Sequence, residues 1–185
     1  MPLDIAAGIF IALGASRIFD IGLSPWILLF AVVFSVLPDA DFIVEWMRYG
    51  SVGGKVIREH RNLFHFPLTF IPVVAAIYFI FGGFWAALFG AAACFHLLHD
   101  SIGIGWGIKW WWPFRGRSYK FFADRDGSFS SRLLVYWEDK DLPEVVAKYG
   151  DPDWISSTYL RFTAVSAAEF TALLFALISL YFWWT

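Results

Sequence analysis

The segment GFWAALFGAAACFHLLHDSIG, residues 83–103, is apolar up to Phe95 and then carries His96, His99 and Asp100 within five residues. A helix of this length could cross a bilayer, which takes roughly 20 mostly apolar residues. On a helix, His96 and Asp100 lie one turn apart on one face, and His99 flanks them. This end of the segment is either a helix terminus at the polar interface or part of a metal site just below a membrane surface.

The composition of the whole chain indicates a membrane protein. Of its 185 residues, 59% are hydrophobic and only 16% are charged, whereas soluble proteins are about half apolar and about a quarter charged. The net charge of −2 gives no argument for a nucleic acid partner. The single cysteine, Cys94, cannot form a disulfide within the chain.

Hydropathy predicts an all-α, polytopic membrane helix bundle that forms a single domain over residues 1–185. About five transmembrane helices are expected, near residues 3–19, 23–38, 67–82, 84–102 and 160–184. Gly82-Gly83 separates the third from the fourth, so these two should form an antiparallel hairpin.

Two polar segments, 39–66 and 103–159, hold most of the lysines and arginines. With five spans, both segments and the N-terminus lie on one side of the membrane, and the opposite side holds only Arg17. The positive-inside rule places that shared side in the cytoplasm and the C-terminus outside. All four histidines of the chain then face the cytoplasm.

Six residues near these helix ends are the predicted metal ligands. A charged group deep in a bilayer costs about 2.5–3.5 kcal/mol, so a cluster of carboxylates needs a compensating cation. Imidazole and carboxylate ligands suit zinc first, with manganese or iron as alternatives. Six ligands are more than one tetrahedral zinc requires and would suit two ions. The predicted ligands are Asp39, Asp41, His60, His65, His96 and Asp100.

Other features could support such a site. Arg61 could clamp a phosphate oxygen with its forked donors, or be an ordinary juxtamembrane cation. His99 is either a ligand or a partner of a ligand, and Glu169, in the last apolar segment, should form an interhelix hydrogen bond. The run WGIKWWWPFRGRSYK, 106–120, fits a membrane-surface anchor, and it could also recruit an anionic lipid headgroup.

Four short motifs occur in a characteristic order: LPDAD (37–41), HRNLFH (60–65), HLLHD (96–100) and WPF (112–114). This pattern resembles the YdjM-type family of LexA-regulated inner-membrane proteins, predicted membrane-bound, metal-dependent hydrolases that are distantly similar to zinc-dependent phospholipase C. The resemblance implies a prokaryotic inner-membrane location and a metal-site core over residues 37–114. The matching positions are Pro38, Asp39, Asp41, His60, Arg61, His65, His96, Asp100, Pro113 and Phe114.

The expected function is hydrolysis of a phosphoester by metal-activated water, with Arg61 steadying the developing negative charge. Membrane lipid is the expected partner. The depth of the site and the tryptophan-rich run favour a lipid substrate. Two other classes remain open: a transporter or channel that passes metal ions or protons along the His and Asp side chains, and a membrane scaffold whose metal is structural.

Overall fold

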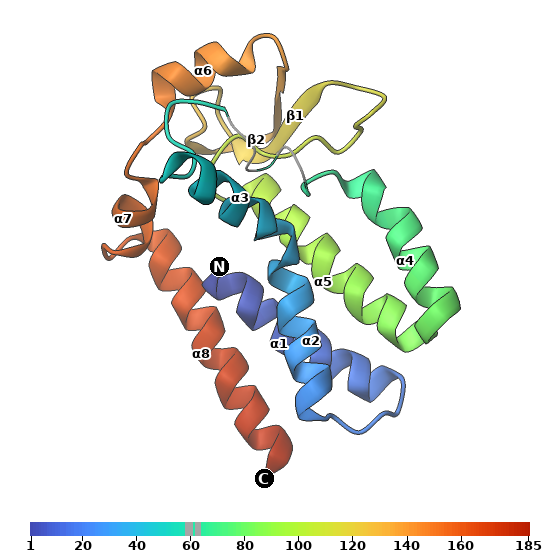
Figure 1. Cartoon of the computed structure of the whole chain (residues 1–185). Helices are drawn as coiled ribbons and strands as arrows, with labels where there is room; N and C mark the ends of the chain where they lie inside the picture. Colours follow the sequence, from blue (N-terminus) through green and yellow to red (C-terminus); the bar gives the residue numbers. More distant parts are fainter. Residues whose placement is uncertain (58–60, 62–63) are drawn as a thin grey trace. The chain divides into compact units, whose positions relative to one another are not determined.

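A computed structural model describes every residue except 58–60 and 62–63 (Figure 1). The chain is mostly helical, as predicted, but it also contains one β-hairpin. It divides into two compact units, one formed by 1–37, 70–96 and 155–185, the other by 38–69 and 97–154.

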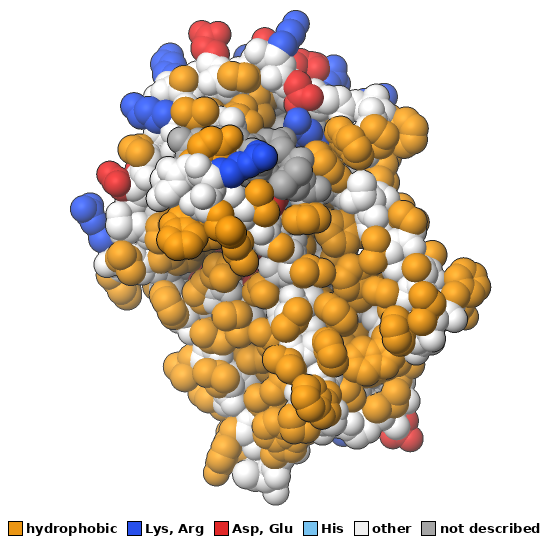
Figure 2. All heavy atoms as spheres, in the orientation of Figure 1, with side chains coloured by type: hydrophobic (Ala, Val, Ile, Leu, Met, Phe, Trp, Pro, Cys, Tyr) orange, Lys and Arg blue, Asp and Glu red, His pale blue; other side chains and the backbone are white. Residues whose placement is uncertain are grey.

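The first unit is a bundle of apolar helices. It contains α1 (Pro2–Ile18), α2 (Pro25–Val36), most of α4 (Pro67–Phe81), most of α5 (Gly83–Ile102), and α8 (Ala164–Trp184). On the face drawn in Figure 2, hydrophobic side chains predominate over these helices, and few Lys, Arg, Asp or Glu side chains are seen among them. A surface of this kind is typical of helices in contact with lipid.

Helix α1 lies between α2 and α8. Ala12 and Ala15 contact Ile27 and Ala31 of α2. On the α8 side, Ala6, Ile9 and Leu13 pack with Ala176. Helices α1 and α2 come close to one another at Gly8. A Cβ at Gly8 would lie 2.8 Å from the Cα of Val32, so only glycine allows the two backbones this approach.

The predicted hairpin between the third and fourth apolar segments is confirmed. Helix α4 ends at Phe81, Gly82 takes the left-handed conformation with φ +91°, and α5 begins at Gly83. Phe70 and Phe89 then contact each other across the hairpin at 5.9 Å between ring centroids.

The structure does not support the prediction of about five membrane-spanning helices. Within the part of the chain that the structure describes, two helical stretches are long and apolar enough to cross a membrane: Pro25–Tyr49, which runs through α2, the short 3-10 helix η1 (Leu37–Asp39) and α3 (Ala40–Tyr49), and α8. Helices α1 and α4 have 17 and 15 residues. At about 1.5 Å per residue they fall short of a hydrocarbon core about 30 Å thick. Helix α5 has 20 residues, but its last two turns include His96, His99, Asp100 and Ser101.

The second unit contains α3, the antiparallel strands β1 (Arg117–Ala123) and β2 (Phe129–Glu138), and α6 (Leu142–Tyr149). The short helix α7 (Trp154–Tyr159) leads from this unit to α8. The turn of the hairpin contains Asp126-Gly127, with Gly127 at φ +82°. Ala123, Val135 and Trp137 of the hairpin pack against Leu142 and Val146 of α6.

The hairpin corrects the expected all-α class. The all-α prediction placed no strands in residues 103–159, yet β1 and β2 are rich in aromatic and branched residues, which favour strands. In β1 the buried and less buried positions alternate at Ser118, Tyr119 and Lys120, as expected for a strand with one covered face.

Candidate metal centre

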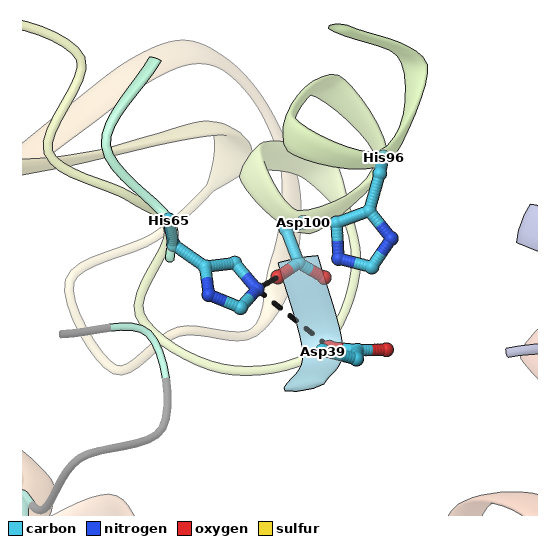
Figure 3. A group of neighbouring side chains, drawn as sticks. All are labelled: Asp39, His65, His96 and Asp100. Carbon is cyan, nitrogen blue, oxygen red and sulfur yellow. Dashed lines mark ion pairs between the residues drawn. The ribbon is translucent and has the colours of Figure 1, made fainter. Parts of the chain in front are cut away.

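Four side chains form a cluster that could hold a metal ion: Asp39, His65, His96 and Asp100 (Figure 3). Each offers one ligand atom, and these atoms lie within 4.8 Å of one another. Asp39 is the last residue of η1, and His65 lies just before α4. His96 and Asp100 lie on consecutive turns of α5. His96 is the last residue of the first unit's part of α5, and the same helix continues without a break into Asp100.

Local sequence explains how these side chains are presented. The residue before a proline avoids the helical conformation, so Phe66 keeps His65 outside α4, which begins at Pro67. Four residues separate His96 from Asp100 on a continuous helix, which places them on one face. The two ligand positions on α5 therefore follow from helical spacing alone.

The buried carboxylate of Asp41 orients His65. Asp41 Oδ2 lies 3.0 Å from His65 Nδ1, and both side chains are fully buried. Because a carboxylate only accepts hydrogen bonds, Nδ1 must carry the proton. The other ring nitrogen, Nε2, faces Asp100 Oδ2 at 3.1 Å and Asp39 Oδ1 at 3.6 Å. A lone pair facing two carboxylates calls for a positive charge between them.

The carboxylates around His65 raise the pKa of its imidazole. Burial lowers the pKa of this imidazole, but hydrogen bonds to Asp100, Asp39 and Asp41 together outweigh burial and raise the pKa to about 10. Without a metal ion, a proton therefore supplies the positive charge. The cluster is thus a site with strong preference for a cation.

His96 is oriented in a similar way, but from the first unit. Its Nδ1 lies 2.8 Å from the Ser35 carbonyl oxygen and 3.2 Å from Asp4 Oδ1, both of which are acceptors. Asp4 is 1% exposed, and its other oxygen lies 2.7 Å from the Met1 amino group. With Nδ1 donating, Nε2 of His96 is left as the ligand atom.

Arg61 contacts the cluster through Asp100. Its Nη2 donates to Asp100 Oδ1 at 2.9 Å, and its backbone N–H donates to Asp41 Oδ2 at 3.0 Å. Gly105 leaves room for the guanidinium, because a Cβ there would lie 2.6 Å from Arg61 Nη1. Lys120 lies nearby: it is 3% exposed, and its ammonium donates to the carbonyl oxygens of Gly103 and Gly105 at 2.6 Å each.

The predicted site residues take different places. The structure brings Asp39, His65, His96 and Asp100 together, whereas Asp41 reaches the cluster through His65 and Arg61 reaches it through Asp100. His99 is half-buried on α5 and is not a member of this four-residue group. His60 lies outside the described residues.

Two residues that contribute here were missed in the sequence. Asp4 is an acidic residue in an otherwise apolar stretch, which is a signal for a buried partner. Lys120 gave no such signal, since it ends the run 106–120, which is expected to be a membrane-surface anchor.

Comparison with known proteins identifies the family of the chain. No curated protein and no solved structure matches the chain significantly. The model of one family, described as YdjM inner membrane protein, matches residues 4–185. This match supports a membrane location, while LexA regulation and likeness to phospholipase C remain predictions. A match over nearly the full length means that the chain belongs to the YdjM inner membrane protein family.

Proposed function

We propose that this protein is a membrane-embedded, metal-dependent hydrolase that acts on a phosphoester. One observation carries the proposal: His65 and His96 both engage acceptors through Nδ1, and His65 turns Nε2 toward the carboxylates of Asp39 and Asp100. Carboxylates or carbonyls behind the ligating imidazoles are typical of metal sites in enzymes.

The donor set fits a divalent transition metal. Asp39, His65, His96 and Asp100 would hold it, and two imidazoles with two carboxylates suit zinc before manganese or iron. His60 remains a proposed further ligand, and with Asp41 it would be needed for a second ion. A bound divalent metal ion supplies an acidified water and polarises a phosphoryl oxygen at neutral pH.

The surrounding residues have proposed roles of their own. Asp41 and Asp4 hold the imidazoles in the tautomer that leaves Nε2 for the metal ion. A guanidinium has five N–H donors, so Arg61 keeps donors beyond its bond to Asp100. We propose that these donors stabilise negative charge on the phosphoryl group, and that His99 assists from the next position on the helix.

The substrate and the sidedness are also proposals. The tryptophan-rich segment 106–120 favours a phosphoester carried by a membrane lipid. Eight of the chain's 14 lysines and arginines lie in 103–159, which favours a cytoplasmic position for this segment, the site and the N-terminus, with the C-terminus outside. A phosphatase reporter at the C-terminus should then be active and a cytoplasmic fluorescent reporter silent; the reverse pattern would overturn the proposed orientation.

The main test compares metal content with turnover. Purified wild-type protein should contain stoichiometric metal and hydrolyse members of a phosphoester panel. His96→Ala and Asp39→Ala should lose both properties, and Glu144→Gln, an exposed carboxylate on α6, should lose neither. Metal binding without turnover would favour the scaffold. Uptake of labelled zinc into proteoliposomes, again without turnover, would favour a transporter.

A further inference from the structure

The segment 109–117, here called the tryptophan loop, is attached at two points to side chains that neighbour the metal centre in the sequence. Trp110 Nε1 donates to Ser101 Oγ at 2.9 Å. The Trp112 ring stacks on Phe66 with 4.4 Å between centroids and an interplanar angle of 18°. Ser101 follows Asp100 and Phe66 follows His65, so the loop is attached next to two of the four ligand candidates.

Two aromatic side chains of the loop are not used for this attachment. Trp111 is 54% exposed, although it lies between the two attached tryptophans, and Phe114, two residues after Trp112, is 81% exposed. Large exposed aromatic rings are unfavourable in water, whereas tryptophan is enriched where a protein meets the headgroup region of a bilayer. In a membrane protein, these two rings are placed to enter that region.

An open cavity with two arginines in its lining lies at the C-terminal end of the loop. It has a volume of about 360 Å³ and is lined by Arg115, Gly116, Arg117 and Glu138. Glu138 Oε1 accepts two hydrogen bonds from Arg117, each 2.7 Å long, so the charge of Arg117 is balanced. Arg115 is exposed and forms no ion pair with any residue that the structure describes, which leaves one positive charge at the cavity.

We propose that the tryptophan loop binds an anionic phospholipid, with the headgroup phosphate on Arg115 and the rings of Trp111 and Phe114 at the boundary between headgroups and acyl chains. This binding goes beyond the proposed hydrolysis and does not require it. Because the loop is attached beside His65 and Asp100, a lipid bound there would be held next to the metal centre. Arginine suits this role because its planar fork matches phosphate oxygens.

Lipid retention tests the proposal. Protein purified from nanodiscs that contain equal amounts of phosphatidylglycerol and phosphatidylcholine is analysed by native mass spectrometry for bound lipid. Wild-type protein should retain phosphatidylglycerol preferentially. Arg115→Gln should reduce that retention about fivefold, the factor that corresponds to about 1 kcal/mol for one cation near an anionic surface. Trp111→Ala combined with Phe114→Ala should lower the retention of both lipids.

Two controls make the result specific. Arg125→Gln removes an exposed charge from the turn at the opposite end of the hairpin and should leave lipid retention unchanged. Free glycerol phosphate at millimolar concentration should not displace the lipid. Equal retention by wild type and Arg115→Gln, or full displacement by glycerol phosphate, would overturn the proposal. Metal content and phosphoester turnover, measured on the same samples, show separately whether the proposed hydrolase stands.

Discussion

Replacing Asp41 with asparagine tests whether this carboxylate orients His65 or binds the metal ion itself. Asp41 Oδ2 accepts from His65 Nδ1 and from the backbone N–H of Arg61 at 3.0 Å each, and from that of Phe64 at 3.5 Å. Asparagine keeps the shape, and its amide oxygen can replace Oδ2 as the acceptor of all three bonds. It carries no negative charge, however, so it holds the proton on His65 Nδ1 less strongly and leaves Nε2 a weaker ligand atom.

The size of the effect follows from this role. Loss of a partner behind a ligating histidine typically weakens metal binding about 10- to 100-fold, or about 1.4–2.7 kcal/mol at 25 °C. We expect Asp41→Asn to bind one equivalent of zinc with a dissociation constant raised by that factor. His65→Ala and Asp100→Ala, which remove ligand atoms, should lose stoichiometric binding. Competition with a chromophoric zinc chelator measures each dissociation constant.

Glu45→Gln is the matched control. Glu45 lies one turn further along α3, is 1% exposed, and accepts from the Gly53 backbone N–H at 2.6 Å. Glu45→Gln therefore shows how much the zinc dissociation constant changes when a buried carboxylate of the same helix, outside the four-residue cluster, is neutralised. If Asp41→Asn abolished stoichiometric binding as His65→Ala does, Asp41 would be a ligand. If it bound zinc as tightly as Glu45→Gln, the orienting role would be refuted.

Three further predictions concern single residues. His96→Ala should lose stoichiometric metal, whereas His99→Ala should keep it and lose only turnover; metal analysis beside an activity assay distinguishes the two, and loss of metal in both would make His99 a ligand. Asp4→Asn should raise the zinc dissociation constant less than Asp41→Asn does, because the Ser35 carbonyl still accepts from His96; an unchanged constant would contradict a role for Asp4. Burial and the charge of Arg61 lower the pKa of Lys120 from 10.5 to about 8, against the opposing effect of Asp100. The unfolded chain therefore binds more protons at Lys120 between these pH values, and the contribution of Lys120 to stability should rise with pH there by up to about 3 kcal/mol. In thermal unfolding, the difference in stability between wild type and Lys120→Met should change by this amount over that range, and parallel curves for the two proteins would refute it.

Much of the site could be predicted where helical spacing decides it. His96 and Asp100 are four residues apart in an apolar helix, which is enough to place them together. Asp39 and Asp41 were both predicted as ligands, yet residues two apart in helical backbone point to different sides. The structure accordingly places only Asp39 in the four-residue cluster and puts Asp41 behind His65.

Contacts between distant parts of the chain were harder to predict. The Glu169 hydrogen bond to another element was expected, and it is confirmed by Tyr159 Oη, which donates at 3.0 Å, and by the Leu3 backbone N–H at 3.4 Å. The sequence did not indicate that Asp4 would lie against His96. Hydropathy also overstated the number of spans. It identifies apolar segments but does not show where each helix begins and ends, and α1 and α4 are shorter than a membrane-spanning helix.

The position of Glu169 has a consequence for biosynthesis. Glu169 bonds α8 to the start of α1, and α1 carries Asp4, which contacts His96. All residues of the metal centre emerge from the ribosome before α8 does, since α8 begins at Ala164. The contacts that hold the first helix against the last can therefore form only after the last helix has been made. The metal centre should mature after translation is complete, and nascent chains that stop before Ala164 should bind zinc weakly.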